Sequence, residues 1–205
     1  MTIIDGDVVD PTNRNRQLPA LSTNHGQSKA MIMAERLQAI NPELQLNVVQ
    51  EFVNPKMVER YLASKPDYII DAIDSITPKI TFIKMAYDSQ IPLVSSMGAG
   101  AKVDPTLLRV VDISETYNCP FAQQVRKNLK KHNIYKGVKA VFSPEKIIKE
   151  SLMIGRQSRQ LPITIGWVNH ISIYNCHSTN ATAGYKLCCK RTHTTQSYHH
   201  DMFLC

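Results

Sequence analysis

Four acidic residues stand at points where two apolar runs of the chain end. Asp5 and Asp7 follow the first run, and Asp71 and Asp74 follow a later one. The carboxyl ends of parallel strands meet at one edge of a sheet, and ligands bind in the crevice outside that edge. A carboxylate there can accept hydrogen bonds from both hydroxyl groups of a ribose. The spacing therefore predicts a nucleotide site, and turn-forming or capping acids are the alternative interpretation.

Two basic residues extend this prediction toward the phosphates of a nucleotide. Arg16 and Lys29 lie close to the first acidic pair in the sequence. An arginine can bind phosphate through two parallel hydrogen bonds, and a lysine acts as a point charge. Asp74 could hold Mg²⁺ on the phosphate oxygens. Taken singly, each of these side chains also fits an ordinary solvated charge.

The elements that must position these residues alternate between strand and helix. Apolar periodicity and turn residues predict strands at 2–5, 44–48, 68–70, 91–94, 107–113 and 138–142, and helices at 28–40, 54–62, 77–87 and 120–131. The connections between them are short. This order predicts an α/β fold with a mostly parallel sheet and helices on both faces.

An ordered four-part motif resembles a known superfamily. The sequence contains Asp5-x-Asp7, Asn13-x-x-Arg16-Gln17, Gly26-x-x-Lys29-Ala30 and Asp71-x-x-Asp74. This pattern is similar to that of the ThiF/MoeB/HesA superfamily, whose members are adenylating enzymes related to ubiquitin-activating enzymes. The resemblance covers about residues 2–166.

Later segments narrow the resemblance to one family. The segments Gly98–Thr106, Val111–Ile113, Cys119–Leu129 and Val141–Ser143 are similar to the tRNA threonylcarbamoyladenosine dehydratases. The resemblance implies that ATP converts the threonyl carboxylate of the modified adenosine into an acyl-adenylate. The neighbouring ureido group then closes a ring, and AMP leaves. An adenylyltransferase for a ubiquitin-like sulfur carrier is the alternative, which Asp74-Ser75 and the lack of a Cys-x-x-Cys pair disfavour.

The resemblance also assigns roles to individual residues. It implies that Asp5 binds the ribose, that the 12–16 loop wraps the nucleotide, and that Asp74 holds Mg²⁺ beside Ser75. The resemblance implies three catalytic residues, Arg16, Lys29 and Asp74. Cations must offset the charge on the leaving pyrophosphate, and these residues supply them as two cationic side chains and a Mg²⁺ ligand. The implied ATP-binding set is Asp5, Thr12, Asn13, Arg14, Asn15, Arg16, Gln17, Lys29, Asp74 and Ser75.

The sequence departs from the family pattern in two places. The family begins with a strand and a Gly-x-Gly-Gly-x-Gly loop that holds the nucleotide phosphates, and the 205 residues contain no such motif. The expected domain is thus an N-terminally truncated, Rossmann-like ThiF-type domain over 2–166. Residues 167–205 have lost the periodicity, and a disordered tail is expected there. A non-catalytic remnant is therefore a third hypothesis.

A basic segment bears on the partner. Residues 123–149 contain eight Lys or Arg and one acid, which suits phosphate contacts with tRNA. The alternative is a solvated helix face. The candidate tRNA-binding residues are Arg126, Lys127, Lys130 and Lys131. The resemblance further implies a homodimer and a sulfur-transfer partner protein.

Composition sets broader limits. The chain has 205 residues, 43% of them hydrophobic and 20% charged, and a formal net charge of +7. No apolar stretch approaches membrane-spanning length, and the N-terminus has no signal-peptide pattern, so a cytoplasmic protein without membrane contact is expected. The five cysteines include no Cys-x-x-Cys pair, which disfavours a zinc knuckle. Cys119, before Pro120, is expected to be structural rather than catalytic.

Overall fold

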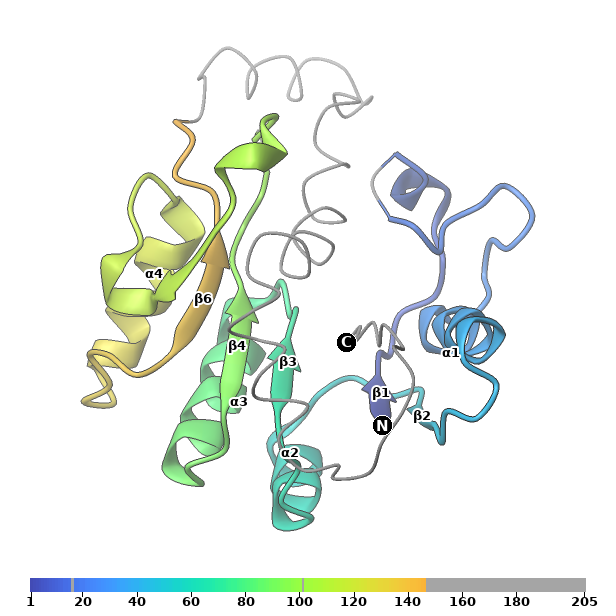
Figure 1. The fold of residues 1–205 in the computed structure, drawn as a ribbon, viewed down its shortest axis with the longest axis horizontal. Helices are drawn as coiled ribbons and strands as arrows, with labels where there is room; N and C mark the ends of the chain where they lie inside the picture. Colours follow the sequence, from blue (N-terminus) through green and yellow to red (C-terminus); the bar gives the residue numbers. More distant parts are fainter. Residues whose placement is uncertain (16, 101, 147–205) are drawn as a thin grey trace, which may run out of the picture.

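The computed structural model describes residues 1–15, 17–100 and 102–146. Strands and helices alternate along the chain, which confirms the predicted α/β fold (Figure 1). The strands are β1 (Thr2–Ile4), β2 (Asn47–Val49), β3 (Ile69–Asp71), β4 (Leu93–Ser96), β5 (Arg109–Asp112) and β6 (Lys139–Phe142). The helices are α1 (Lys29–Ile40), α2 (Pro55–Ala63), α3 (Ile76–Asp88) and α4 (Pro120–Lys130), with 3₁₀ turns at Pro11–Asn13, Pro105–Leu107 and Ile113–Glu115.

The strands form two sheets that are not hydrogen-bonded to each other. β1 pairs in parallel with β2, and the second sheet has the order β3-β4-β6-β5. Within the second sheet only β5 runs antiparallel to its neighbour. In Figure 1, β1 and β3 are the strands by which the two sheets face each other. Among residues 1–15, 17–100 and 102–146 neither makes a ladder to the other, so β1 and β3 are edge strands of the two described sheets.

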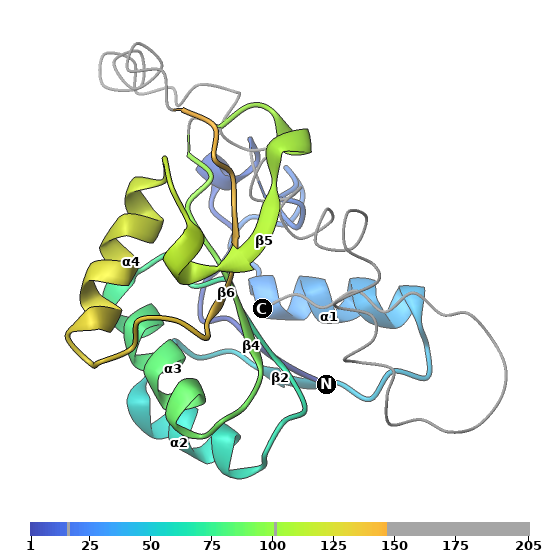
Figure 2. The ribbon, with the colours of Figure 1, turned by 60° about the vertical axis from the view of Figure 1, so that its left-hand side comes forward.

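Local sequence explains where the helices begin. The side chains of Ser28 and Asn54 accept hydrogen bonds from the backbone of the first turns of α1 and α2. Proline occupies the first position of α2 and of α4, where its missing N–H costs nothing. Figure 2 shows α2, α3 and α4 on one side of the strands and α1 on the other. Helices thus cover both faces, as predicted.

Three hydrophobic clusters hold these layers together. The largest lies between α3, α4 and the second sheet and includes Ile83, Val125 and Leu129, all fully buried. A second cluster joins α1 to β1 around Ile3 and Leu37. A third packs α2 against α3 and β3. The cluster around β1 is separate from the two that support the second sheet.

Some predicted boundaries were wrong. The alternation at 44–48 predicted a strand, but β2 covers Asn47–Val49. Leu44 and Leu46 precede it and pack against the cluster under α1, while the carbonyl of Gln45 accepts a hydrogen bond from the amino terminus of Met1 at 2.8 Å just before the β1–β2 ladder begins. The long strand predicted at 107–113 is shorter, because 3₁₀ turns flank β5 on both sides.

Two sequence predictions lie wholly or partly outside the described residues. The tail at 167–205 does so completely, and the 2–166 domain does so beyond residue 146. Within the described residues, no helix has the length and apolar content to cross a membrane.

Candidate functional site

The turn after β1 places two carboxylates beside each other. The backbone N–H of Asp5 continues the β1–β2 ladder to the carbonyl of Val49 at 3.1 Å. The N–H of Asp7 then donates to Oδ1 of Asp5 at 2.8 Å. A Cβ at Gly6 would lie 2.5 Å from the backbone nitrogen of Phe52, so the turn passes against the backbone after β2. Glycine therefore permits this approach and fixes where Asp5 stands.

Asp5 and Asp74 lie in one electrostatic environment, although they come from different sheets. Burial raises the pKa of Asp5, and the negative charges of Asp7 and Asp74 raise it further. The N–H of Asp7 and the ammonium of Lys29 act in the opposite direction. A nearby acid raises a carboxyl pKa because two negative charges repel each other. Burial is the main cause of the raised pKa and the charge of Asp74 the smallest, so a nucleotide site shared by the two acids stays a prediction.

Asp74 is exposed just before α3 begins. It follows β3 in the sequence, and its Oδ1 accepts a hydrogen bond from the hydroxyl of Ser75 at 3.2 Å. Ser75 is the N-cap residue of α3, yet its side chain makes no capping bond to the first turn. The amino end of α3, with its positive dipole end, therefore lies next to the predicted Mg²⁺ ligand.

Lys29 is held by an acid of the same turn. Its ammonium lies 2.9 Å from Oδ2 of Asp7, and its side chain is almost buried at the start of α1. The pair fixes Lys29 beside Asp5, where the sequence predicted a phosphate contact. A phosphate binding there has to share the ammonium with Asp7.

The 10–17 segment is built around a short 3₁₀ turn. Asp10 caps it through bonds to Thr12, and the side-chain oxygen of Asn13 accepts from the N–H of Asp10 at 3.1 Å. Nε of Arg14 donates to the carbonyl of Pro11. Part of the predicted nucleotide loop therefore has local structural contacts. The remaining predicted members are Asn15, which is half-buried, Gln17, and Arg16, which lies outside the described residues.

Gln17 supplies one feature that a ligand could use. Among the described residues, its Oε1 is the buried side-chain polar atom without a hydrogen-bond partner. A buried acceptor of this kind gains stability when a donor reaches it. A hydroxyl or amino group of a bound nucleotide is such a donor.

A buried polar cluster was missed by the sequence analysis. Asp71, Lys79 and Ser95 have no exposed surface. The ammonium of Lys79 lies 2.8 Å from Oδ2 of Asp71, which also accepts from the hydroxyl of Ser95 at 2.6 Å. Burial lowers the pKa of Lys79, and the charge of Asp71 partly offsets this effect. Asp71 is thus the counter-ion of a lysine rather than a ligand-facing acid.

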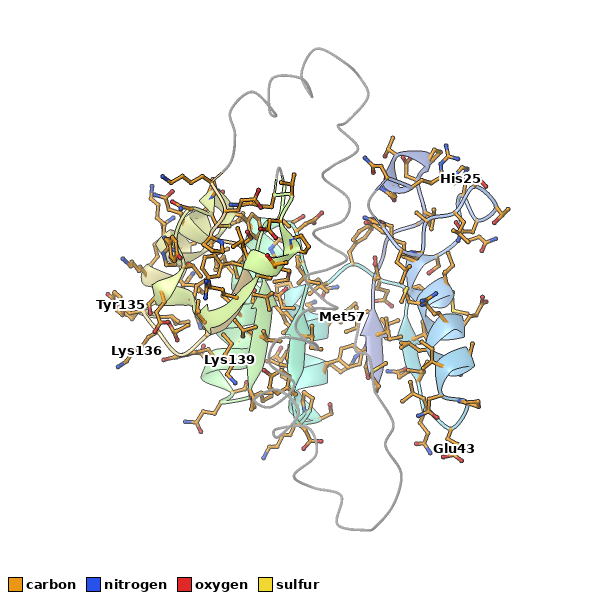
Figure 3. All side chains as sticks on the ribbon, turned by 45° about the horizontal axis from the view of Figure 1, so that its top comes forward. His25, Glu43, Met57, Tyr135, Lys136 and Lys139 are labelled. Atoms are coloured by element: carbon orange, nitrogen blue, oxygen red, sulfur yellow. The ribbon has the colours of Figure 1, made fainter. Side chains whose placement is uncertain are left out.

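The basic residues of α4 are arranged on its exposed side. Lys127, Lys130 and Lys131 are exposed, and Arg126 is half-buried with a bond to the hydroxyl of Thr116. The opposite side of α4 carries Val125 and Leu129 into the core. Figure 3 shows Tyr135, Lys136 and Lys139 pointing outward on the same side of the molecule, away from His25. The exposed lysines on and near α4 and β6 are called the basic surface below; they are Lys127, Lys130, Lys131, Lys136 and Lys139.

Cys119 has a structural position, as expected. Its Sγ lies 3.4 Å from the N–H of Ala122 and so caps α4, and it lies 3.5 Å from the carbonyl of Gly98. The side chain is buried. Within the part of the chain that the structure describes, no group of three metal-ligating side chains occurs.

Comparisons with known proteins identify the family. The ThiF family profile matches residues 1–196, and the chain belongs to this family. It is 43% identical over 155 residues to the tRNA threonylcarbamoyladenosine dehydratase of Escherichia coli K12, covering 72% of this chain and 58% of that protein. It is 42% identical over 152 residues to the Bacillus subtilis 168 dehydratase, covering 73% and 60%.

Solved structures agree with this assignment. The crystal structure of the E. coli dehydratase in complex with ATP aligns with a TM-score of 0.68 at 36% identity, over 89% of this chain and 77% of that one. The complex of the same protein with AMP gives 0.69 at 37% identity, over 88% and 77%. The chain spans about three fifths of the length of the curated relatives that it matches.

Proposed function

We propose that the chain acts in the ATP-dependent modification of tRNA as a threonylcarbamoyladenosine dehydratase. In this reaction the threonyl carboxylate attacks the α-phosphorus of ATP, pyrophosphate leaves, and ring closure then releases AMP. The proposal depends most on the turn after β1, where the N–H of Asp7 donates to Asp5 at 2.8 Å and the carboxylate of Asp7 holds the ammonium of Lys29 at 2.9 Å. The identity to dehydratases from two bacteria supports it.

The residues of the proposed site contact different parts of the nucleotide. Asp5 accepts the ribose hydroxyls, while the 12–17 segment and Lys29 face the phosphates. Lys29 is held for this role by Asp7. Arg16 supplies the second cation and Ser75 supports Asp74. The buried Oε1 of Gln17 favours a ligand that donates a hydrogen bond, as a nucleotide does.

Mg²⁺ fits the same edge of the sheets. In nucleotide sites this ion needs only one or two carboxylates, because phosphate oxygens and water complete its coordination. An exposed Asp74 before the amino end of α3 meets that requirement, and the described residues need no three-ligand cluster for it. When bound, Mg²⁺ neutralises charge on the departing phosphates.

The proposal includes the partners of the reaction. The substrate is tRNA, and the basic surface of α4 and β6 binds its phosphates. A homodimer, a sulfur-transfer partner protein and a cytoplasmic location complete the proposal. The sulfur-carrier adenylyltransferase is less well supported, because the relatives described above are dehydratases.

Titration of the isotope-labelled chain with Mg-ATP tests the nucleotide site. We expect the largest changes in amide chemical shift at Asp5, Asp7, Asp74 and Ser75. AMP is expected to change the chemical shifts of Asp5 and Asp7 only. Asp5→Asn keeps the acceptor for the N–H of Asp7 but loses the charge, so affinity falls by roughly tenfold or more. Shifts confined to other residues contradict the proposal.

The same variant has a predicted effect on stability. A carboxyl whose pKa is raised by folding destabilises the native state above that pKa, because the ionised form is the less favoured one there. Asp5→Asn is therefore expected to raise the melting temperature slightly at pH 7. The exposed Asp67→Asn is the matched control and leaves both readouts unchanged. In the wild type, nucleotide affinity falls as the pH drops through the raised pKa of Asp5.

Charge reversal on α4 tests the tRNA surface. We expect Lys127→Glu with Lys131→Glu to weaken tRNA binding and to lower the salt slope of log K by about 2, one for each lost phosphate contact. Filter binding at several salt concentrations measures this. Lys56→Glu with Lys65→Glu changes the net charge equally at exposed sites near α2 and is the control. If both double variants lose tRNA affinity equally, only the net charge matters, and the proposed tRNA-binding surface on α4 is rejected.

A further inference from the structure

Lys79 reaches backwards from α3 to the loop that precedes this helix. Its ammonium donates to the carbonyl oxygen of Ile73 at 2.9 Å, in addition to its ion pair with Asp71. Oδ1 of Asp71 accepts from the N–H of Ile73 at 2.9 Å. Both backbone polar groups of Ile73 are therefore held by one buried ion pair.

The contact with Ile73 bears directly on Asp74. The carbonyl of Ile73 belongs to the peptide group that joins these two residues, so its orientation sets the direction in which the Asp74 backbone continues. Asp74 itself is exposed, with Ser75 as its described side-chain partner. The position of an exposed loop residue such as Asp74 is therefore set by its backbone rather than by contacts of its own side chain.

The ion pair is poorly explained by stability alone. Lys79 and Asp71 are both fully buried, and replacing such a pair by apolar residues is often neutral or stabilising. The surroundings suit an apolar side chain, since Phe121 has its ring 5.8 Å from the ammonium and Ile83 lies one turn along the helix. What an apolar residue cannot supply is the donor to the carbonyl of Ile73.

We propose that Lys79 is a positioning residue: with Asp71 as its counter-ion, it fixes the Ile73–Asp74 peptide and so sets the position of Asp74 before α3. The functional part of this inference rests on the proposed nucleotide site. Ser95 has a different role: its hydroxyl donates to Asp71 from β4 and makes no described bond to Ile73.

The variants follow from these contacts. Asp71→Asn with Lys79→Met removes both charges together, so no unpaired ion is left in the core. The asparagine oxygen can still accept from the N–H of Ile73, but the carbonyl of Ile73 loses its donor. Ser95→Ala is the matched control, because it removes a buried partner of Asp71 and leaves both bonds to Ile73.

Backbone relaxation of the unliganded protein gives the first readout. We expect the order parameter of the Asp74 amide to fall from about 0.85, typical of rigid backbone, to below about 0.6 in the double variant. In Ser95→Ala it stays at the wild-type value, and the amide of Val94 in β4 stays rigid in both. No change in the double variant, or an equal fall in Ser95→Ala, overturns the inference.

Ligand titration gives the second readout. We expect the double variant to lose the Mg²⁺-dependent part of the ATP-induced shift at Asp74 and to keep the shift that AMP produces at Asp5. Loss of both shifts together means a general structural defect and rejects a positioning role. If the order parameters change as expected but the ATP shifts of the wild type fall only at residues outside the proposed site, positioning by Lys79 is supported and the proposed function alone fails.

Discussion

Mg-ATP is expected to bind the purified 205-residue chain roughly 10²- to 10⁶-fold more weakly than it binds the E. coli relative that has been crystallised with ATP. Within the described residues, no glycine-rich turn leads from a strand directly into a helix. The segment between β3 and α3 contains no glycine, and the Gly98 and Gly100 pair after β4 precedes a 3₁₀ turn. Such loops offer several backbone N–H groups and a positive helix end to phosphate.

The size of the effect follows from these missing donors. Each charge-assisted hydrogen bond contributes about 1.5–3 kcal/mol, and about 1.4 kcal/mol changes affinity tenfold. Two or three lost bonds give the range stated above. Calorimetry on both proteins in the same buffer makes the comparison. Low-micromolar binding contradicts this prediction.

Lys79→Ala is expected to lower the free energy of unfolding by about 3–5 kcal/mol. The substitution leaves the carboxylate of Asp71 fully buried, with neutral donors from Ser95 and Ile73 but no counter-ion. An unpaired buried charge is expensive, and a typical domain has only about 5–15 kcal/mol of stability in total. Urea denaturation followed by circular dichroism measures the loss.

The charge-balanced variant separates two explanations of that loss. Asp71→Asn with Lys79→Met removes the ion pair without stranding a charge, so it is expected to destabilise the protein much less than Lys79→Ala. If both variants lose equal stability, packing around the lysine stem is responsible, and the argument from the unpaired carboxylate is wrong.

The strands that precede Asp5 and Asp74 could be predicted from the sequence because short apolar runs end just before these acids. Asp5 follows β1 and Asp74 comes after β3, as predicted, but the two strands lie in different sheets, which the pattern of apolar runs did not indicate. The position of Lys29 was also predicted, but its ion pair with Asp7 was not. Short-range pairing depends on side-chain direction, which spacing alone does not determine.

The buried lysine shows why other features escaped prediction. Charged residues on a helix are normally assigned to the solvent side, so the burial of Lys79 was not predicted. Its spacing carried the signal, because Lys79, Ile83 and Ala86 fall on one helical stripe and all are buried. A carboxylate at the end of a buried strand, as in Asp71, needs a cation nearby, and this stripe provides one. The antiparallel direction of β5 is set by tertiary pairing with β6 and has no local signature.

The separation of the two sheets has a consequence for cooperativity. The strands β1 and β2, with α1, have their own hydrophobic cluster, and in the part of the chain that the structure describes no ladder links them to the sheet of β3 to β6. Units that share few hydrogen bonds and little core can open one at a time, each with its own free energy. The chain then lacks one unfolding equilibrium common to all its residues. Asp5 belongs to one unit and Asp74 to the other, so the affinity of any ligand that bridges them includes the free energy of keeping both units folded and docked.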